Sequence, residues 1–159
     1  MRRVSASLFG VAAIFACAAE AAFAAETTVP FIANVTSTCV LTLGTPGTLG
    51  ANADFSQLSS KNAGGAAGTV TALTTGTGFQ VSASAPTAFL IAPTGGDDNV
   101  TFSATYEANG ATSVGEVLGT VTSELNFGLT NVNVNLAANK SSGAFPAGAY
   151  TAEVVVRCE

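Results

Sequence analysis

The sequence predicts an all-β protein, an antiparallel β-sandwich. Apolar and polar residues alternate in short runs, which glycine and turn residues separate at roughly 8–12-residue spacing, and helical periodicity is weak. Thr, Ser, Asn, Ala and Gly are abundant, whereas charged residues make up only 9% of the chain. This composition is typical of sheets whose outer faces carry hydroxyls and amides, and it is unlike that of disordered, charge-rich segments.

The first 24 residues have the features of a secretory signal peptide. A basic start is followed by an apolar run over residues 8–19, and Ala22 and Ala24 provide the small residues that a signal peptidase reads. We therefore expect cleavage after Ala24, which leaves residues 25–159. The alternative is a lipoprotein with Cys17 as the lipidated residue, which the bulky Phe15 disfavours because a small residue is wanted there.

Residues 25–159 suit a single domain with a core of its own. They contain three basic and nine acidic residues, a net charge of −6. This charge gives no attraction for nucleic acid or for anionic lipid. We expect no membrane span in this part, because no segment is apolar enough over a sufficient length.

Two cysteines, Cys39 and Cys158, remain after cleavage. In an exported protein the default expectation is a disulfide between them, with two free thiols or cross-links between subunits as the alternatives. Each cysteine shares the apolar parity of its own run, so a bridge would lie inside the sandwich or at its edge and join the first core strand to the last. Closing so long a loop contributes about 4–5 kcal/mol in the chain-entropy model.

The alternating runs place the expected strands in order. The first run carries Val29, Phe31, Ala33 and Val35, continues in the same parity through Cys39, Leu41 and Leu43, and ends at the turn residues 44–47. The following strands are expected at 70–73, 79–83, 88–91, 100–106, 117–125 and 132–136. The last strand carries Tyr150, Ala152, Val154, Val156 and Cys158 on one face.

Three connecting segments have their own signals. Residues 57–62 are compatible with one helical turn, residues 93–98 form a turn, and Asn109-Gly110 predicts a tight hairpin turn. Gly76-Thr77-Gly78 lacks the third glycine and the following helix of a phosphate-binding loop, so we interpret it as a turn before a strand.

The residues that usually perform catalysis are scarce. The chain has no histidine, and none of its serines lies in a Gly-x-Ser-x-Gly elbow. Asp97-Asp98 is the one carboxylate pair, and a solvated turn explains it better than a calcium site because no further acid lies nearby. Phe127 and Phe145 are better explained by core or strand-cap positions than by a binding platform. We therefore expect no enzyme activity, no cofactor and no metal.

Taken together, these features resemble the pilin superfamily of chaperone–usher systems, including the spore coat U-like and fimbrial major subunit proteins. "TTVPFIANVTSTCVLTL" is similar to the amino-terminal donor segment and the first-strand cysteine of that family. "GTVTALTTGTGFQVSAS" is similar to its second and third strands, and "FPAGAYTAEVVV" to its closing strand. "NVTFSATYEANG" fits the central hairpin more loosely.

The resemblance implies an immunoglobulin-like sandwich that lacks one strand and is completed by a strand from another subunit. Residues 25–36 would be the donor-strand extension and residues 37–159 the domain, with Val29, Phe31, Ala33 and Val35 as the inserted side chains. The acceptor groove would be bordered by the last strand, at Tyr150, Ala152, Val154 and Val156. The partners would be copies of this chain or related subunits, a periplasmic chaperone and an outer-membrane usher, and the location a cell-surface fimbrium or the extracellular space.

Two features depart from the family pattern. The second strand has no cysteine, so the partner of Cys39 can only be Cys158, and the chain ends in Arg157-Cys158-Glu159 rather than in an aromatic-containing strand. A bridge between the first and last strands would suit a closed sandwich. The alternative function is therefore a self-complete, monomeric β-sandwich that acts as a binding module in the periplasm or outside the cell.

Overall fold

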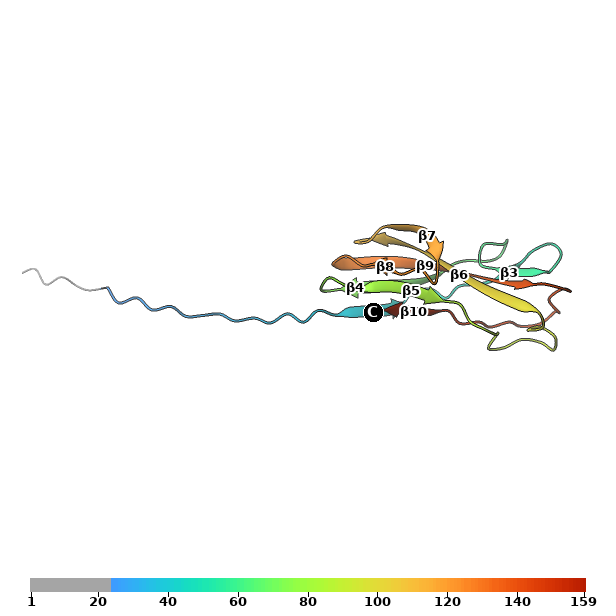
Figure 1. The fold of residues 1–159 in the computed structure, drawn as a ribbon, viewed down its shortest axis with the longest axis horizontal. Helices are drawn as coiled ribbons and strands as arrows, with labels where there is room; N and C mark the ends of the chain where they lie inside the picture. Colours follow the sequence, from blue (N-terminus) through green and yellow to red (C-terminus); the bar gives the residue numbers. More distant parts are fainter. Residues whose placement is uncertain (1–23) are drawn as a thin grey trace, which may run out of the picture. The chain divides into compact units, whose positions relative to one another are not determined.

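A computed structural model describes residues 24–159 of the chain, and this part folds into β-strands without a helix (Figure 1). All strand pairs are antiparallel and fall into two sheets. The strands are β1 (Cys39–Leu43), β2 (Gly50–Ala51), β3 (Gln57–Ser59), β4 (Gly68–Thr74), β5 (Gln80–Ser84), β6 (Val100–Gly110), β7 (Val114–Leu118), β8 (Ser123–Glu124), β9 (Gly128–Lys140) and β10 (Val155–Cys158).

The long strand β9 is the centre of the larger sheet. Strand β6 pairs with it from Val100↔Lys140 to Gly110↔Thr130. On the other side, β4 pairs with the first half of β9 and β3 with the second half. Strand β1 extends the sheet beyond β4, β2 beyond β3, and β7 beyond β6.

The smaller sheet has the strand order β10-β5-β8. Its central strand β5 buries Val81 and Ala83 against the larger sheet, and Tyr106 of β6 reaches across to the main chain of Val81. The predicted fold class is therefore confirmed: the described chain is an all-β antiparallel sandwich, consistent with an immunoglobulin-like fold.

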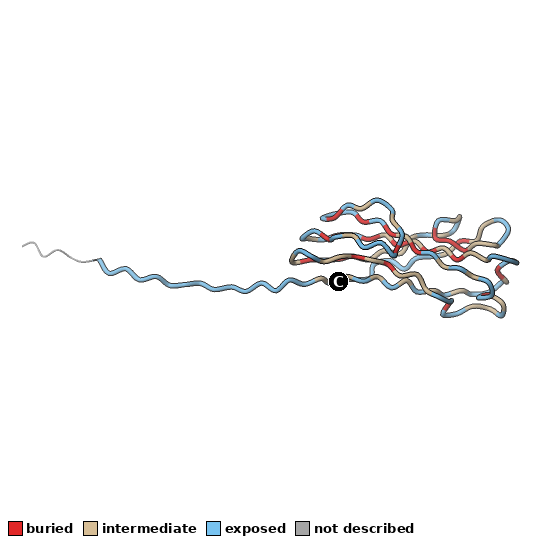
Figure 2. The backbone as a smooth tube through the Cα atoms, in the orientation of Figure 1, coloured by how far each residue is buried: buried red, intermediate tan, exposed pale blue. Residues whose placement is uncertain are grey.

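The alternation of side chains explains why these segments form strands. Along β9, Thr130, Val132, Val134, Leu136 and Ala138 are buried, whereas the residues between them lie on the outer face and are mostly amides (Figure 2). Successive side chains of a strand point to opposite faces, so this pattern covers the core on one side and meets water on the other. The core consists of two clusters, one around Tyr106 and Val132 and one around Phe89 and Phe145.

Two of the predicted local structures are wrong. Residues 57–59 form strand β3 rather than a helical turn, because Leu58 is buried in the second cluster and pairs with Ala138. Residues 88–91 form no strand. Phe89 is buried there, but Leu90 and Ile91 are exposed, and the strand pairing of this segment is limited to an isolated bridge between Ile91 and Thr151.

Three predicted boundaries also differ from the structure. Asn109 and Gly110 still pair with β9, so the hairpin turn follows them at residues 111–113. The expected strand at 117–125 is divided between β7 of the larger sheet and β8 of the smaller one. The chain crosses between the sheets at Gly119, where a Cβ would lie 1.9 Å from the carbonyl oxygen of Ala83. The last strand was expected to run from Tyr150 to Cys158, but β10 begins only at Val155. The residues before it border a groove.

Candidate strand-binding groove

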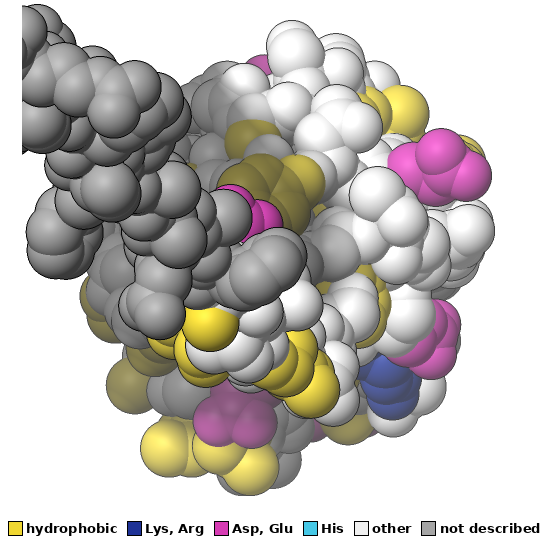
Figure 3. Space-filling view, turned by 90° about the vertical axis from the view of Figure 1, so that its left-hand side faces the viewer, with side chains coloured by type: hydrophobic (Ala, Val, Ile, Leu, Met, Phe, Trp, Pro, Cys, Tyr) yellow, Lys and Arg dark blue, Asp and Glu magenta, His cyan; other side chains and the backbone are white. Residues whose placement is uncertain are grey.

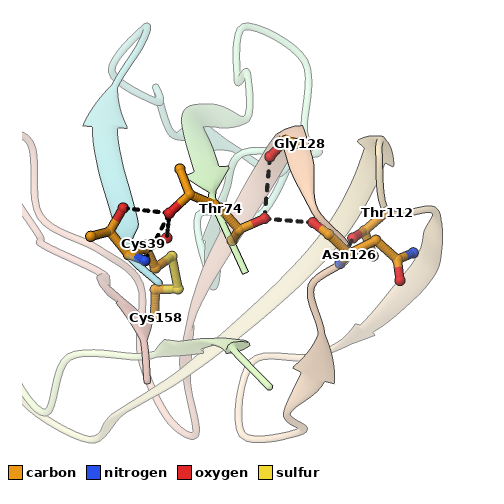
Figure 4. The surroundings of a disulfide bond; sticks show 8 residues. Cys39, Thr74, Thr112, Asn126, Gly128 and Cys158 are labelled. Carbon is orange, nitrogen blue, oxygen red and sulfur yellow. Dashed lines mark hydrogen bonds between the residues drawn. A yellow bond between two sulfur atoms is a disulfide. The ribbon is translucent and has the colours of Figure 1, made fainter. Parts of the chain in front are cut away.

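One side of the sandwich has an unpaired edge on each sheet. Strand β1 pairs with β4 alone, and strand β10 pairs with β5 alone. The side chains of Cys39, at the start of β1, and Cys158, at the end of β10, form a disulfide with a Cα–Cα distance of 6.4 Å (Figure 4). The predicted bridge is confirmed, and both cysteines pack against the first core cluster as their parity indicated.

The disulfide joins β1 and β10 without making them one sheet. In the described chain the two strands share no ladder of hydrogen bonds. Near the bridge, Thr74 is fully buried on β4 and its hydroxyl donates to the carbonyl oxygen of Asn126 at 2.5 Å (Figure 4). At this end of the sandwich the disulfide therefore holds β1 and β10 together.

Away from the disulfide, a groove of about 630 Å³ separates the two edges. Its floor includes Val134 and Leu136 of β9, and Leu136 belongs to neither core cluster. One wall is formed by residues around Leu43 and Leu49, and the other by residues 150–156. The groove therefore lies where an additional strand would join the two clusters of the core.

The wall at 150–156 is extended, but most of it is unpaired. Strand β10 begins only at Val155, and before it Thr151 bonds to Ile91. Within the described chain, the main chain of residues 152–154 makes no backbone hydrogen bond. The predicted groove residues Tyr150, Ala152, Val154 and Val156 are all half-buried and line the groove, whereas the residues between them are exposed.

The groove carries little charge. Glu153 is the one charged residue of its lining. At the far end, the Tyr150 hydroxyl donates to the carbonyl oxygen of Pro146 at 2.7 Å. Burial, together with the negative charge of Asp97, raises the pKa of Tyr150, so this phenol stays neutral at physiological pH. An apolar ligand with main-chain hydrogen-bonding groups suits this site better than an ionic one.

The predicted donor residues lie outside any strand. Val29, Phe31 and Val35 are 67%, 94% and 81% exposed, and Ala33 is exposed as well. The chain divides into two units, Met1–Ala33 and Asn34–Glu159, so most of the donor residues and the groove belong to different units. The expected signal peptide covers residues 1–24, of which 1–23 lie outside the described residues.

The segment that leads into β1 is attached to the turn after β4. The main-chain nitrogen of Thr38 donates to the hydroxyl oxygen of Thr75 at 2.9 Å, and the nitrogen of Thr75 donates to the carbonyl oxygen of Thr38, also at 2.9 Å. The Thr75 hydroxyl also lies 3.2 Å from the carbonyl oxygen of Thr36. The chain is therefore bound to the sandwich from Thr36 onward.

The remaining candidates have structural roles. The carboxylate of Asp97 accepts a hydrogen bond from the main chain of Phe89 at 2.9 Å, as expected for a turn. Phe145 is buried in the core, whereas Phe127 is 69% exposed just before β9. Among residues 24–159 no cluster of acidic or cysteine side chains could hold a metal ion, and no helix is long and apolar enough to cross a membrane.

Sequence reasoning located one wall of the groove and missed the rest. Leu43 was expected in the core with Cys39 and Leu41, but it is 70% exposed and lines the groove. Leu49, Val134 and Leu136 were not assigned to it at all. Their apolar parity signals burial in a core, and it does not reveal that they border a groove.

Comparison of the chain with protein-family models, with curated proteins and with solved structures gives no match. The groove and the segment that precedes β1 are therefore the features of this chain that indicate a function.

Proposed function

We propose that this chain is a secreted structural subunit that assembles into surface fibres by donor-strand exchange and supports adhesion. The observation that carries the proposal is the groove between the unpaired edges of β1 and β10, in a chain that also has an exposed segment of alternating apolar residues. In such an assembly the segment of one copy fills the groove of the next.

The segment and the groove match in length and in chemistry. The four donor side chains span residues 29–35, and the half-buried wall spans 150–156, seven residues in each case. Successive side chains of a strand alternate between its two faces, so the odd-numbered residues enter the groove together. The unpaired main chain of residues 152–154 gains hydrogen-bond partners, as in other cases of strand addition.

Burial of the donor side chains provides the driving force. Full burial of a Val or Phe side chain contributes about 1.5–3 kcal/mol relative to exposure. Ordering the segment costs about 1–2 kcal/mol per residue in backbone entropy. The free energy gained from the new hydrogen bonds and apolar contacts must exceed this cost. Phe31, at 94% exposure, has the largest apolar surface to gain from insertion.

The proposal includes the cellular route. The subunit is exported through the periplasm, where a chaperone covers the groove until an outer-membrane usher brings subunits together. The unpaired edges explain why cover is needed, because exposed strand edges pair with other chains. The proposed role is structural rather than enzymatic.

Deleting residues 25–35 tests the donor-strand role. The deletion removes the segment and leaves the groove and the disulfide in place. We expect export and folding of the domain without fibres, which electron microscopy of the cell surface measures. Fibres of unchanged number and length would contradict the proposal.

The disulfide favours a second candidate, a self-complete monomer that acts as a binding module. A bridge between the first and last strands limits how far the two edges can separate. Size-exclusion chromatography of the purified chain 25–159 discriminates between the candidates. A stable monomer whose residues 25–35 are protected from proteolysis supports the module, whereas oligomers or a need for a chaperone support the fibre subunit.

A further inference from the structure

A row of exposed apolar side chains crosses the outer face of the larger sheet. The strand register places Val40 opposite Leu73, and Leu73 opposite Leu129. Directly opposed residues of antiparallel strands project from the same face, so these three side chains are neighbours. They are 53%, 44% and 51% exposed, and we call them the apolar row.

The apolar row differs from the rest of this face. The next outward-facing residues on the same three strands are Thr42, Thr71 and Asn131, and the register places them side by side as well. Hydrophobic side chains (yellow) also reach the surface, among backbone and side chains of other types, at the end of the sandwich seen in Figure 3. A contiguous apolar patch bordered by polar residues is typical of an interaction site.

The length of the chain determines what can cover the apolar row. Val35 is the last donor residue, and Val40 lies only five residues after it. A fully extended chain spans at most about 3.3–3.6 Å per residue, so Val35 stays within roughly 18 Å of Val40. The bonds of Thr36 and Thr38 to Thr75 shorten this reach further. Any molecule that takes up Val35 therefore binds a residue within roughly 18 Å of the apolar row.

We propose that the apolar row is a second contact between consecutive copies of this chain. The copy that binds residues 29–35 in its groove also covers Val40, Leu73 and Leu129. Three side chains are too small an area to hold two free proteins together. The donated strand makes the contact effectively intramolecular, so a small patch is sufficient. The inference rests on the proposed donor-strand function.

The test compares assembled chains in which single features are changed. The variant Leu73→Thr/Leu129→Thr removes two of the three side chains of the apolar row and introduces β-branched residues, which suit strands and resemble the neighbouring Thr42 and Thr71. Leu118→Thr is the matched control, because Leu118 is 60% exposed on β7, the strand at the opposite edge of the sheet from β1. Phe31→Asp, which places a charge on the donor strand, is the reference for loss of strand donation.

The measured quantity is the rate at which subunits leave the assembled polymer in dilute urea, with circular dichroism as the check on folding. We expect the double variant to assemble and to lose subunits about tenfold faster, since interface substitutions act mainly on dissociation. Leu118→Thr should match the wild type, and Phe31→Asp should not assemble.

The possible failures are distinguishable. Wild-type dissociation of the folded double variant, with no assembly of Phe31→Asp, overturns the second contact and leaves the donor-strand function standing. Full assembly of Phe31→Asp contradicts the donor-strand function itself. An equal effect of Leu118→Thr would show a general response to loss of surface leucines and would also overturn the inference.

Discussion

At the scale of single residues, Tyr106 connects the two sheets. Its side chain is fully buried on β6, and its hydroxyl lies 3.1 Å from the carbonyl oxygen of Val81, 3.0 Å from that of Val121 and 2.7 Å from the hydroxyl oxygen of Ser123. A buried hydroxyl needs a hydrogen-bond partner, and this one has acceptors on strands β5 and β8 and on the loop between β7 and β8.

Replacing Tyr106 with Phe should lower the free energy of unfolding by about 1–2 kcal/mol, because buried acceptors lose a donor. Urea denaturation followed by circular dichroism measures the change. Thr71→Val is the control, since the Thr71 hydroxyl bonds to Asn131 on the outer face, where water can replace it. Equal stability of Tyr106→Phe and the wild type would contradict this account of the core.

Glu116 shows how an exposed charge is tuned by its neighbours. Hydrogen bonds from Lys61 and from Thr105 lower the pKa of Glu116, with a smaller effect from the Lys61 charge. A carboxyl whose pKa is lowered by folding stabilises the native state above its ordinary pKa, and this contribution is lost as the pH falls through the lowered value. Because both side chains are exposed, solvent screening keeps the contribution small.

The variant Lys61→Met should raise the pKa of Glu116 toward the ordinary value for a glutamate. Titration of the Glu116 side chain by nuclear magnetic resonance measures the shift. Asp54 is an internal control, because its pKa is lowered by hydrogen bonds from Ser56 rather than by Lys61. An unchanged Glu116 titration would mean that the ion pair is absent in solution.

At the scale of elements, partners decide where the strands end. The apolar alternation at the carboxyl end runs from Tyr150 to Cys158, yet β10 begins only at Val155, where pairing with Ser84 of β5 begins. The residues before it keep their alternating burial but face the groove. At the opposite end of the groove, the disulfide between Cys39 and Cys158 sets how closely β1 and β10 approach each other.

Removing the disulfide with Cys39→Ser/Cys158→Ser should lower the free energy of unfolding by about 4–5 kcal/mol in the chain-entropy model. The two cysteines are 119 residues apart, so the bridge constrains nearly the whole unfolded domain. Urea denaturation measures the loss, and the reduced wild type is the control that should match the variant. Unfolding of the oxidised wild type at the same urea concentration as the variant would contradict the prediction.

At the scale of the whole molecule, the chain combines an apolar groove with a segment, residues 29–35, whose apolar side chains are exposed. On the face seen in Figure 3, a few acidic side chains are scattered among hydrophobic side chains and groups of other types. The net charge of −6 of residues 25–159 repels nearby copies, so contacts between them depend on shape and apolar burial. The alternation of inward-facing and outward-facing side chains along residues 29–35 is therefore the feature to test.

Two adjacent residues provide that test, because Phe31 and Ile32 are 94% and 93% exposed and lie on opposite faces of an extended strand. Phe31→Asp should abolish polymer formation, since it would place a charge in the groove. Ile32→Asp should have a much smaller effect, because its side chain would face away. Light scattering of the purified chain measures assembly. Equal effects of the two substitutions would contradict insertion in the predicted register.

Much of the fold could be predicted from the sequence, because alternation in segments such as 100–106 and 132–136 reflects burial directly. The short strand β3 and the crossing at Gly119 could not, since they depend on contacts with residues far away in the chain. For the groove, the parity of residues 150–156 identified one wall, whereas Leu43 was assigned to the core.

The sequence by itself determined the all-β class and the alternation of buried and exposed faces along the long strands, because side-chain parity is a local property of the chain. It made a bridge between Cys39 and Cys158 the default expectation, and the structure shows that bridge. Only the tertiary structure decided that β1 and β10 meet at their disulfide without pairing, and that an apolar groove opens beyond it. The physical reason is that a strand's own alternation reports the burial of its two faces and not the pairing of its two edges. An unpaired edge is visible only when the neighbouring strands have been placed.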